Sequence, residues 1–169
     1  MISIGELPQL HSDSVPAQRQ STESLRVCLV ALGEKTFAID LHQVAEVFVP
    51  ESITPVPGMP AALVGVTNLR GTIIPLADVR AVFDVSASGL PKYAVVVRHG
   101  IQQVGILVEN VPEIRTIPSD DLVTTSVRTA TESLPLFSGF VTIDKKSSTI
   151  LEISQLLASI ERTVNDQNS

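Results

Sequence analysis

Short apolar runs separated by turn residues dominate the chain from residue 25 onward. Residues 25–32 and 36–41 are two such runs, and Gly33 and Glu34 lie between them. Alternation of large and small or polar side chains with a period of two is typical of strands, so this stretch predicts a β-hairpin. The same pattern predicts further strands at residues 44–49, 63–69, 72–76, 93–98, 102–108, 111–117, 137–143 and 149–152.

Helical periodicity is confined to the end of the chain. Residues 153–163 place Ile153, Leu156, Leu157 and Ile160 on one face, which predicts an amphipathic helix. A short helical turn is also expected after Asp78. Since long crossover helices are absent from the pattern, the strands favour small barrels or sandwiches over a parallel sheet.

The sequence contains an internal repeat. Residues 38–47 align with residues 105–114, so that Ala38 matches Gly105. Gly65 matches Gly139 at a slightly larger offset, and a turn and an apolar strand follow each of them. Two similar halves predict two small barrels related by an approximate two-fold axis, with a groove between them as a natural binding site.

Composition and charge narrow the classes of partner. Hydrophobic residues make up 44% of the 169 residues, which is enough for a core, and the formal net charge is −6. An acidic chain lacks the basic surface that nucleic acids and anionic membranes require. No secretory signal or membrane-spanning run is recognised, so we expect a cytoplasmic protein without membrane insertion. The single cysteine, Cys28, lies in an apolar run and is expected to be buried.

The two ends of the chain differ from its middle. Residues 1–24 are rich in Ser, Gln and Pro and have no periodicity, so they are expected to form a disordered extension. Residues 164–169 are expected to form a flexible tail. The folded part is placed at residues 25–163, as two intertwined subdomains with a boundary near residues 84–92.

No catalytic or metal-binding constellation is recognised. His11, His42 and His99 are far apart and lack ligand spacing, so no metal site is expected. Ser138-Gly139 lacks the flanking glycine of a nucleophile elbow, and the pair Asp120-Asp121 is expected in a solvated turn. We therefore predict no enzyme activity and no cofactor.

Several separated motifs occur in an order that resembles one known family. The central run includes Leu63-Val64-Gly65-Val66-Thr67-Asn68-Leu69-Arg70-Gly71 and continues to Asp78-Val79-Arg80. Phe37-Ala38-Ile39-Asp40-Leu41 and Val44-Ala45-Glu46-Val47 precede it, and Val104-Gly105-Ile106-Leu107-Val108 follows it. Together they resemble the CheW family of chemotaxis coupling proteins over roughly residues 25–160.

The resemblance implies an all-β fold of two five-stranded SH3-like barrels related by a pseudo-two-fold axis. It also implies a non-catalytic adaptor with two partners. One partner is the regulatory domain of a CheA-like histidine kinase, and the other is the cytoplasmic tip of a chemoreceptor. The protein is then expected in the cytoplasm, in association with membrane receptor arrays.

The resemblance also points to a partner-binding site. Its receptor-facing groove falls on Val44, Gly65 and Ile114, and Glu46 and Arg70 match an acid and an arginine of signalling importance in the family. With the turn residues Asn68 and Leu69, these complete the predicted site.

Residue chemistry allows two interpretations of this site. Asn68 and Gly71 suit a tight turn, so Arg70 could be only a solvated turn residue, or it could pair with Glu46 and orient the groove wall. Gly65 inside a strand could mark a bulge or the close approach of a helical partner. On the second interpretation, Gly65→Trp blocks the partner while sparing stability.

Three alternative functions remain. A CheW paralogue in a pilus-motility, surface-sensing or developmental pathway would have the same architecture with different partners. A small-ligand-binding β-barrel module would need a closed apolar cavity, and an enzyme would need buried titratable groups gathered in a cleft.

Overall fold

The computed structural model describes residues 24–87, 89–124 and 136–162. The predicted extension apart from Ser24, the predicted tail and His11 lie outside these residues. The described chain is built mainly of strands and ends in one helix, which confirms the predicted all-β class.

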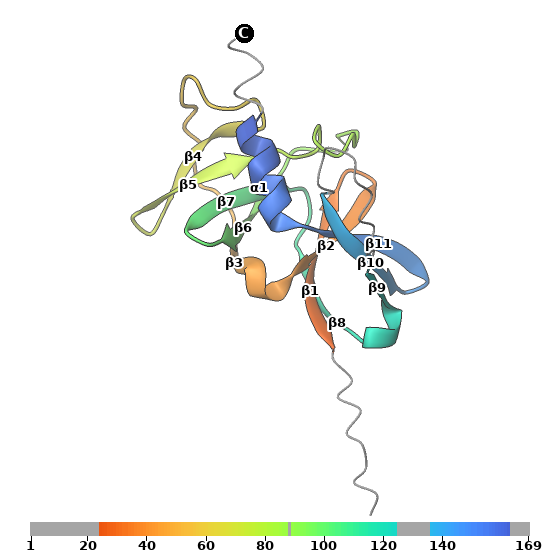
Figure 1. The fold of residues 1–169 in the computed structure, drawn as a ribbon. Coiled ribbons are helices and arrows are strands. Elements are labelled where there is room, and N and C mark those ends of the chain that lie inside the picture. The colour runs from red at the N-terminus through yellow and green to blue at the C-terminus, as the bar shows by residue number, and fades with distance from the viewer. Residues whose placement is uncertain (1–23, 88, 125–135, 163–169) are drawn as a thin grey trace, which may run out of the picture.

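The strands form two sheets, which Figure 1 shows side by side with the helix α1 between them. The six-stranded sheet has the order β8-β1-β2-β11-β10-β9, and the five-stranded sheet has the order β3-β6-β7-β5-β4. The elements are β1 (Leu25–Leu32), β2 (Lys35–Asp40), η1 (Leu41–Gln43), β3 (Val44–Phe48), β4 (Leu63–Leu69), β5 (Thr72–Ala77), β6 (Tyr93–His99), β7 (Gln102–Val108), β8 (Glu113–Ile117), η2 (Ser119–Asp121), β9 (Leu122–Thr124), β10 (Phe137–Ile143), β11 (Lys146–Leu151) and α1 (Ile153–Arg162).

Small differences from the predicted elements have local causes. β11 begins at Lys146, earlier than the pattern suggested, because Asp144 and Lys145 alone make the hairpin turn with positive φ angles of 49° and 63°. The short strand β9 was not predicted. The short helical turn expected after Asp78 is present as a run of turns in which the Phe83 N–H donates to the Val79 carbonyl.

The internal repeat is visible in the strand order. Strands β1 to β5 of the first half correspond to β6, β7, β8, β10 and β11 of the second half. Under this correspondence both sheets have the same order, except that β9 adds a sixth strand to one edge. The register agrees as well, since Cys28 lies opposite Ile39, and their counterparts in the repeat, Val95 and Ile106, also lie opposite each other. The two sheets therefore share one plan.

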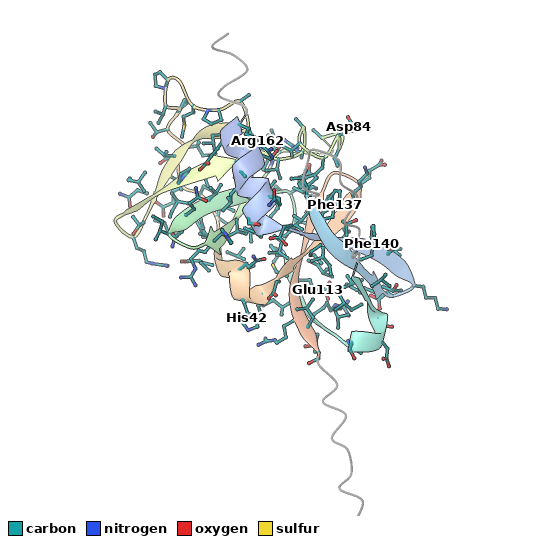
Figure 2. The ribbon with its side chains drawn as sticks, in the orientation of Figure 1. His42, Asp84, Glu113, Phe137, Phe140 and Arg162 are labelled. Atoms are coloured by element: carbon teal, nitrogen blue, oxygen red, sulfur yellow. The ribbon has the colours of Figure 1, made fainter. Side chains whose placement is uncertain are left out.

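Each half contributes its third strand to the other half's sheet. β2 lies in the six-stranded sheet and β3 in the five-stranded one, whereas β7 lies in the five-stranded sheet and β8 in the six-stranded one. The chain therefore crosses from one sheet to the other twice. In Figure 2, His42 lies in the connection from β2 to β3, and Glu113 begins β8 after the connection from β7. Residues 84–92, where the boundary between subdomains was expected, connect two strands of the same sheet. The chain passes from one sheet to the other at residues 41–43 and 109–112.

Three apolar clusters result from this exchange. The largest includes buried residues from both sheets and the buried face of α1, so it is a core that the two halves share. Two smaller clusters lie within the separate sheets, around Val141 in one and Leu76 in the other. β6 is buried on both faces from Ala94 to Val97, and β1 has buried residues on both faces, which explains why the two strands have nearly continuous apolar sequences.

Candidate functional site

The turn between β4 and β5 presents the predicted arginine at the tip of a hairpin. Arg70 and Gly71 are its two central residues, with φ angles of 49° and 86°, as a two-residue type I′ turn requires. The Gly71 N–H donates to Asn68 Oδ1 at 2.8 Å and holds the turn closed. Asn68 therefore stabilises the turn that carries Arg70. The predicted tight turn is confirmed.

Glu46 lies on β3, at the opposite edge of the five-stranded sheet from β4. A shift in strand register between Val44 and Glu46 precedes its pairing with β6. Arg70 Nη2 donates to Glu46 Oε2 and forms an ion pair across the sheet. The Arg70 side chain is 72% exposed and that of Glu46 is 27% exposed. We call this pair the hairpin latch, because it joins the β4–β5 tip to the far edge strand.

The latch borders a surface depression of about 330 Å³. Its lining residues are Ala45, Glu46, Leu69, Arg70, Thr72, Ile74, Val96, Arg98 and Gln103. The hydrogen bond to Glu46 raises the pKa of Arg70 above its ordinary value, so the guanidinium is charged at any physiological pH. The depression thus presents a paired cation and carboxylate to a partner.

Four of the seven predicted site residues belong to this one place. Glu46 and Arg70 form the latch, Leu69 lines the depression, and Asn68 closes the turn. Glu46 and Arg70 are 24 residues apart in the sequence, and their ion pair corresponds to the second of the two interpretations of Arg70 given by residue chemistry.

Val44 and Ile114 lie elsewhere. Val44 is half-buried at the margin of the shared core, opposite Val97 of β6. Ile114 lies on β8 of the six-stranded sheet and is 56% exposed. Its counterpart in the repeat is Val47 on β3, which is 40% exposed. Each of the two exchanged strands therefore carries an exposed apolar residue at the same position.

Gly65 is buried beneath a segment of its own chain. A Cβ atom there would lie 2.5 Å from the Thr54 carbonyl oxygen and 2.9 Å from Ile53 Cγ2, and the φ angle is 155°. The expectation that Gly65→Trp spares stability is therefore wrong, because any side chain displaces this segment. The expected close backbone approach is present, but Thr54 makes it.

A second latch, absent from the sequence-based prediction, lies on the other sheet. Asp144, the counterpart of Arg70, lies at the β10–β11 tip, and its Oδ2 is 3.4 Å from Arg115 Nη2 on β8. Arg115 Nε also lies 2.6 Å from Glu113 Oε1, although the buried Nε has no aligned hydrogen bond. The adjoining depression measures about 600 Å³. The repeat was the available signal, since the offset that relates Gly65 to Gly139 also relates Arg70 to Asp144.

The two latches and the depressions beside them suit binding by surface complementarity. Within the described ranges, no group of three or more His, Cys, Asp or Glu side chains is arranged to hold a metal ion. None of the helices in the same ranges has the length and apolar character that a membrane span requires.

Comparison with known proteins fits this architecture. The model of the family described as "CheW-like domain" matches residues 26–161. The chain belongs to the CheW-like family. A solved CheW, the scaffolding protein TtCheW from Thermoanaerobacter tengcongensis, superposes with a TM-score of 0.66 at 27% identity and covers 76% of this chain and 88% of its own.

Curated relatives carry related names. "Chemotaxis protein CheW" of Klebsiella aerogenes is 26% identical over 140 residues, which are 82% of this chain and 84% of that protein. "Protein PilI" of Pseudomonas aeruginosa is 28% identical over 108 residues, which are 63% of this chain and 61% of that protein. Membership of a family of chemotaxis scaffolds is therefore established by sequence and by fold.

Proposed function

We propose that this chain is a non-catalytic adaptor that couples chemoreceptors to a CheA-type histidine kinase. The family is one of signalling scaffolds, and the hairpin latch of Glu46 and Arg70 is the observation that carries the proposal to particular residues. A partner protein can bind a charged, solvent-facing pair beside a depression without any covalent bond being made or broken.

The latch can transmit a signal only if it differs between two states. A scaffold that binds both partners equally well in both signalling states changes nothing, because only differential affinity moves an equilibrium. Glu46 lies on β3, an edge strand of the five-stranded sheet that directly follows the connection from the six-stranded sheet. A partner that opens or tightens the latch therefore moves a strand that is joined directly to the other sheet.

A pathway other than chemotaxis is the second candidate. Similarity to "Protein PilI" supports a CheW paralogue with the same architecture in a pilus-motility, surface-sensing or developmental system. The two candidates differ only in which receptor and kinase bind. Purified receptor fragments and kinases from each type of system, tested side by side with this chain, separate them.

The test of the latch is reconstituted kinase control. Arg70→Ala is expected to keep the wild-type unfolding midpoint, because the side chain is exposed, and to lose receptor-dependent change in kinase autophosphorylation. Arg98→Ala removes a cation from the same depression without touching the latch, and is the matched control.

A charge exchange distinguishes orientation from direct recognition. The double variant Glu46→Arg with Arg70→Glu restores the pair in reverse, so we expect it to recover part of the coupling that Arg70→Ala loses. Wild-type kinase control in Arg70→Ala, or an unfolded Arg70→Ala protein, would contradict the assignment.

A further inference from the structure

The connection between β5 and β6 is anchored in both sheets. We call residues 78–87 the bridge. It leaves the five-stranded sheet after Ala77, and the Asp78 N–H donates to the Ala62 carbonyl at 2.8 Å. Its two ends belong to one sheet, yet its middle packs against the other.

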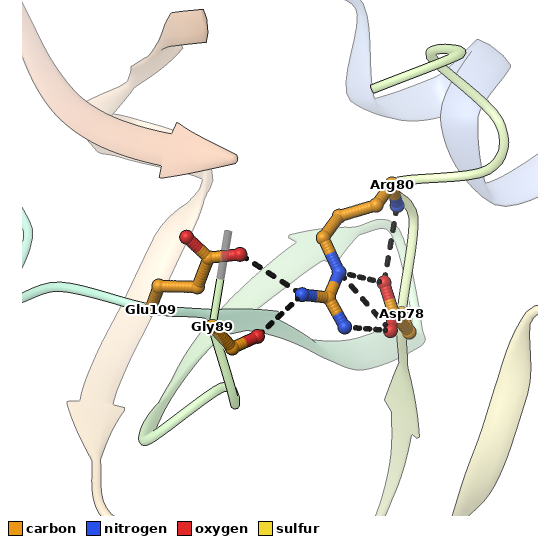
Figure 3. Close-up of polar contacts among 4 residues, drawn as sticks. All are labelled: Asp78, Arg80, Gly89 and Glu109. Atoms are coloured by element: carbon orange, nitrogen blue, oxygen red, sulfur yellow. Dashed lines mark hydrogen bonds and ion pairs between the residues drawn. The ribbon is translucent and has the colours of Figure 1, made fainter. Parts of the chain in front are cut away.

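Arg80 is the anchor on the five-stranded sheet, as Figure 3 shows. Its Nη2 lies 2.7 Å from Asp78 Oδ2, and its Nη1 donates to Glu109 Oε1 at 2.9 Å and to the Gly89 carbonyl at 2.8 Å. The side chains of Arg80 and Glu109 are only 13% and 8% exposed. One guanidinium therefore contacts three places. These are the residue after β5, the residue after β7, which pairs with β5 in parallel, and the segment that leads to β6.

Phe83 is the anchor on the six-stranded sheet. Its ring is 8% exposed and lies between Phe37 of β2 and Phe137 of β10, with ring centroids 4.8 Å and 5.9 Å away. These are ordinary distances for favourable aromatic pairs. The bridge therefore inserts an aromatic side chain from one half into the apolar surface of the other.

A close backbone approach reinforces this contact. Gly33, in the turn between β1 and β2, has a φ angle of 60°, and a Cβ atom there would lie 2.3 Å from the Ser86 carbonyl oxygen and 2.4 Å from Val85 Cγ1. Only glycine allows the turn and the bridge to lie this close. Two unrelated contacts, aromatic and backbone, therefore dock the bridge on the same sheet.

We propose that the bridge fixes the two sheets relative to each other and that Arg80 is the positioning residue that makes it rigid. Glu109 comes directly after β7, at the start of the crossing to β8. Arg80 therefore holds both the bridge and this crossing at one point. Without the guanidinium, the 8% exposed carboxylate of Glu109 loses a charge-assisted hydrogen bond at the end of β7.

Lysine cannot replace Arg80 in this role. The planar guanidinium reaches Asp78, Glu109 and the Gly89 carbonyl at once, whereas an ammonium group is a single point charge. That the rigid relation carries a signal between partners rests on the proposed function. The rigidity itself does not, and it can be measured on the isolated protein.

The test is the distance between spin labels on the two sheets. Labels are placed at Ile101→Cys, in the fully exposed β6–β7 turn, and at Lys145→Cys, in the β10–β11 turn, in a Cys28→Ala background. Pulsed electron paramagnetic resonance then gives the distribution of distances. We expect a single narrow distribution with Arg80 present, and a broadened or shifted one in Arg80→Met.

Two further variants make the result decisive. Glu109→Met leaves the ion pair of Arg80 with Asp78 intact but releases the end of β7, so it is expected to broaden the distribution less than Arg80→Met does. Val141→Ala is the matched control, because Val141 is fully buried in the separate core of the six-stranded sheet. It weakens the fold without touching the bridge and should keep the narrow distribution.

Three results would overturn the proposal. One is an unchanged distribution in Arg80→Met, and another is equal broadening in Val141→Ala. If Arg80→Met does not fold, an unchanged distribution of distances in Glu109→Met overturns the proposal in its place. Since no receptor or kinase is used, any of these results leaves the proposed adaptor function standing, and failure of that function leaves this measurement valid.

Discussion

Gly65 offers a sharp test of the claim that part of the predicted groove is covered by the chain itself. The substitution is Gly65→Ala, the smallest that adds a Cβ atom. Thr54 and Val66 exchange two backbone hydrogen bonds, of 2.8 Å and 2.9 Å, directly beside this position. Gly71→Ala is the control, since Gly71 also has a positive φ angle but nothing lies within 4 Å of an added Cβ.

The cost can be worked out from the contacts. The new Cβ would lie 2.5 Å from the Thr54 oxygen, well inside an ordinary contact, so Thr54 must move and both hydrogen bonds are disturbed. Losing them costs about 1–3 kcal/mol, at about 0.5–1.5 kcal/mol each. Backbone strain at a φ angle of 155° adds about 1–3 kcal/mol. The total is about 2–6 kcal/mol for Gly65→Ala, against about 1–2 kcal/mol for strain alone in Gly71→Ala.

Urea unfolding followed by circular dichroism measures both variants. With a slope of about 1–3 kcal/mol per molar urea, a loss of about 3 kcal/mol lowers the midpoint by about 1–3 M. Gly71→Ala should lower it by less. If Gly65→Ala is no less stable than Gly71→Ala, the Thr54 segment does not cover Gly65 in solution and the position is open to a partner after all.

Two other predictions concern the titratable groups of Asp78 and Cys28. The hydrogen bond from Arg80 lowers the pKa of Asp78, so its stabilisation is complete above the unfolded pKa of about 3.9 and disappears as the pH falls through the lower folded value. Acid titration of the unfolding free energy should therefore show a fall below about pH 4 that is smaller in Arg80→Met, and equal falls would contradict the pair. Burial raises the pKa of the Cys28 thiol, which is 1% exposed, so a thiol reagent should modify it only on unfolding. Rapid modification of the native protein would show that the shared core opens.

Much of the fold could be predicted because its signals are local. Period-two alternation located the strands of both halves, and the repeat that aligns Ala38 with Gly105 matched pairs that the structure places in the same register. Asn68 and Gly71 identified the hairpin turn, since the demand for positive φ is a property of the turn itself.

The parts that could not be predicted depend on contacts between distant segments. The exchange of β3 and β8 between sheets changes no local pattern, because either strand would look the same in either sheet. Arg80 and Glu109 are 29 residues apart, and no local sequence pattern near either residue predicts that they pair. Gly65 did indicate a close approach, but sequence cannot say whether the approaching backbone belongs to a partner or to Thr54.

Co-sedimentation of three purified components tests the adaptor function most directly. The chain is mixed with membranes that carry a chemoreceptor and with a CheA-type kinase, and each pair is compared with the complete mixture. We expect the kinase to sediment with the receptor in much greater amount when the chain is present, and the chain to sediment with both. If the chain binds neither component, or if kinase recovery is the same without it, the adaptor function is contradicted.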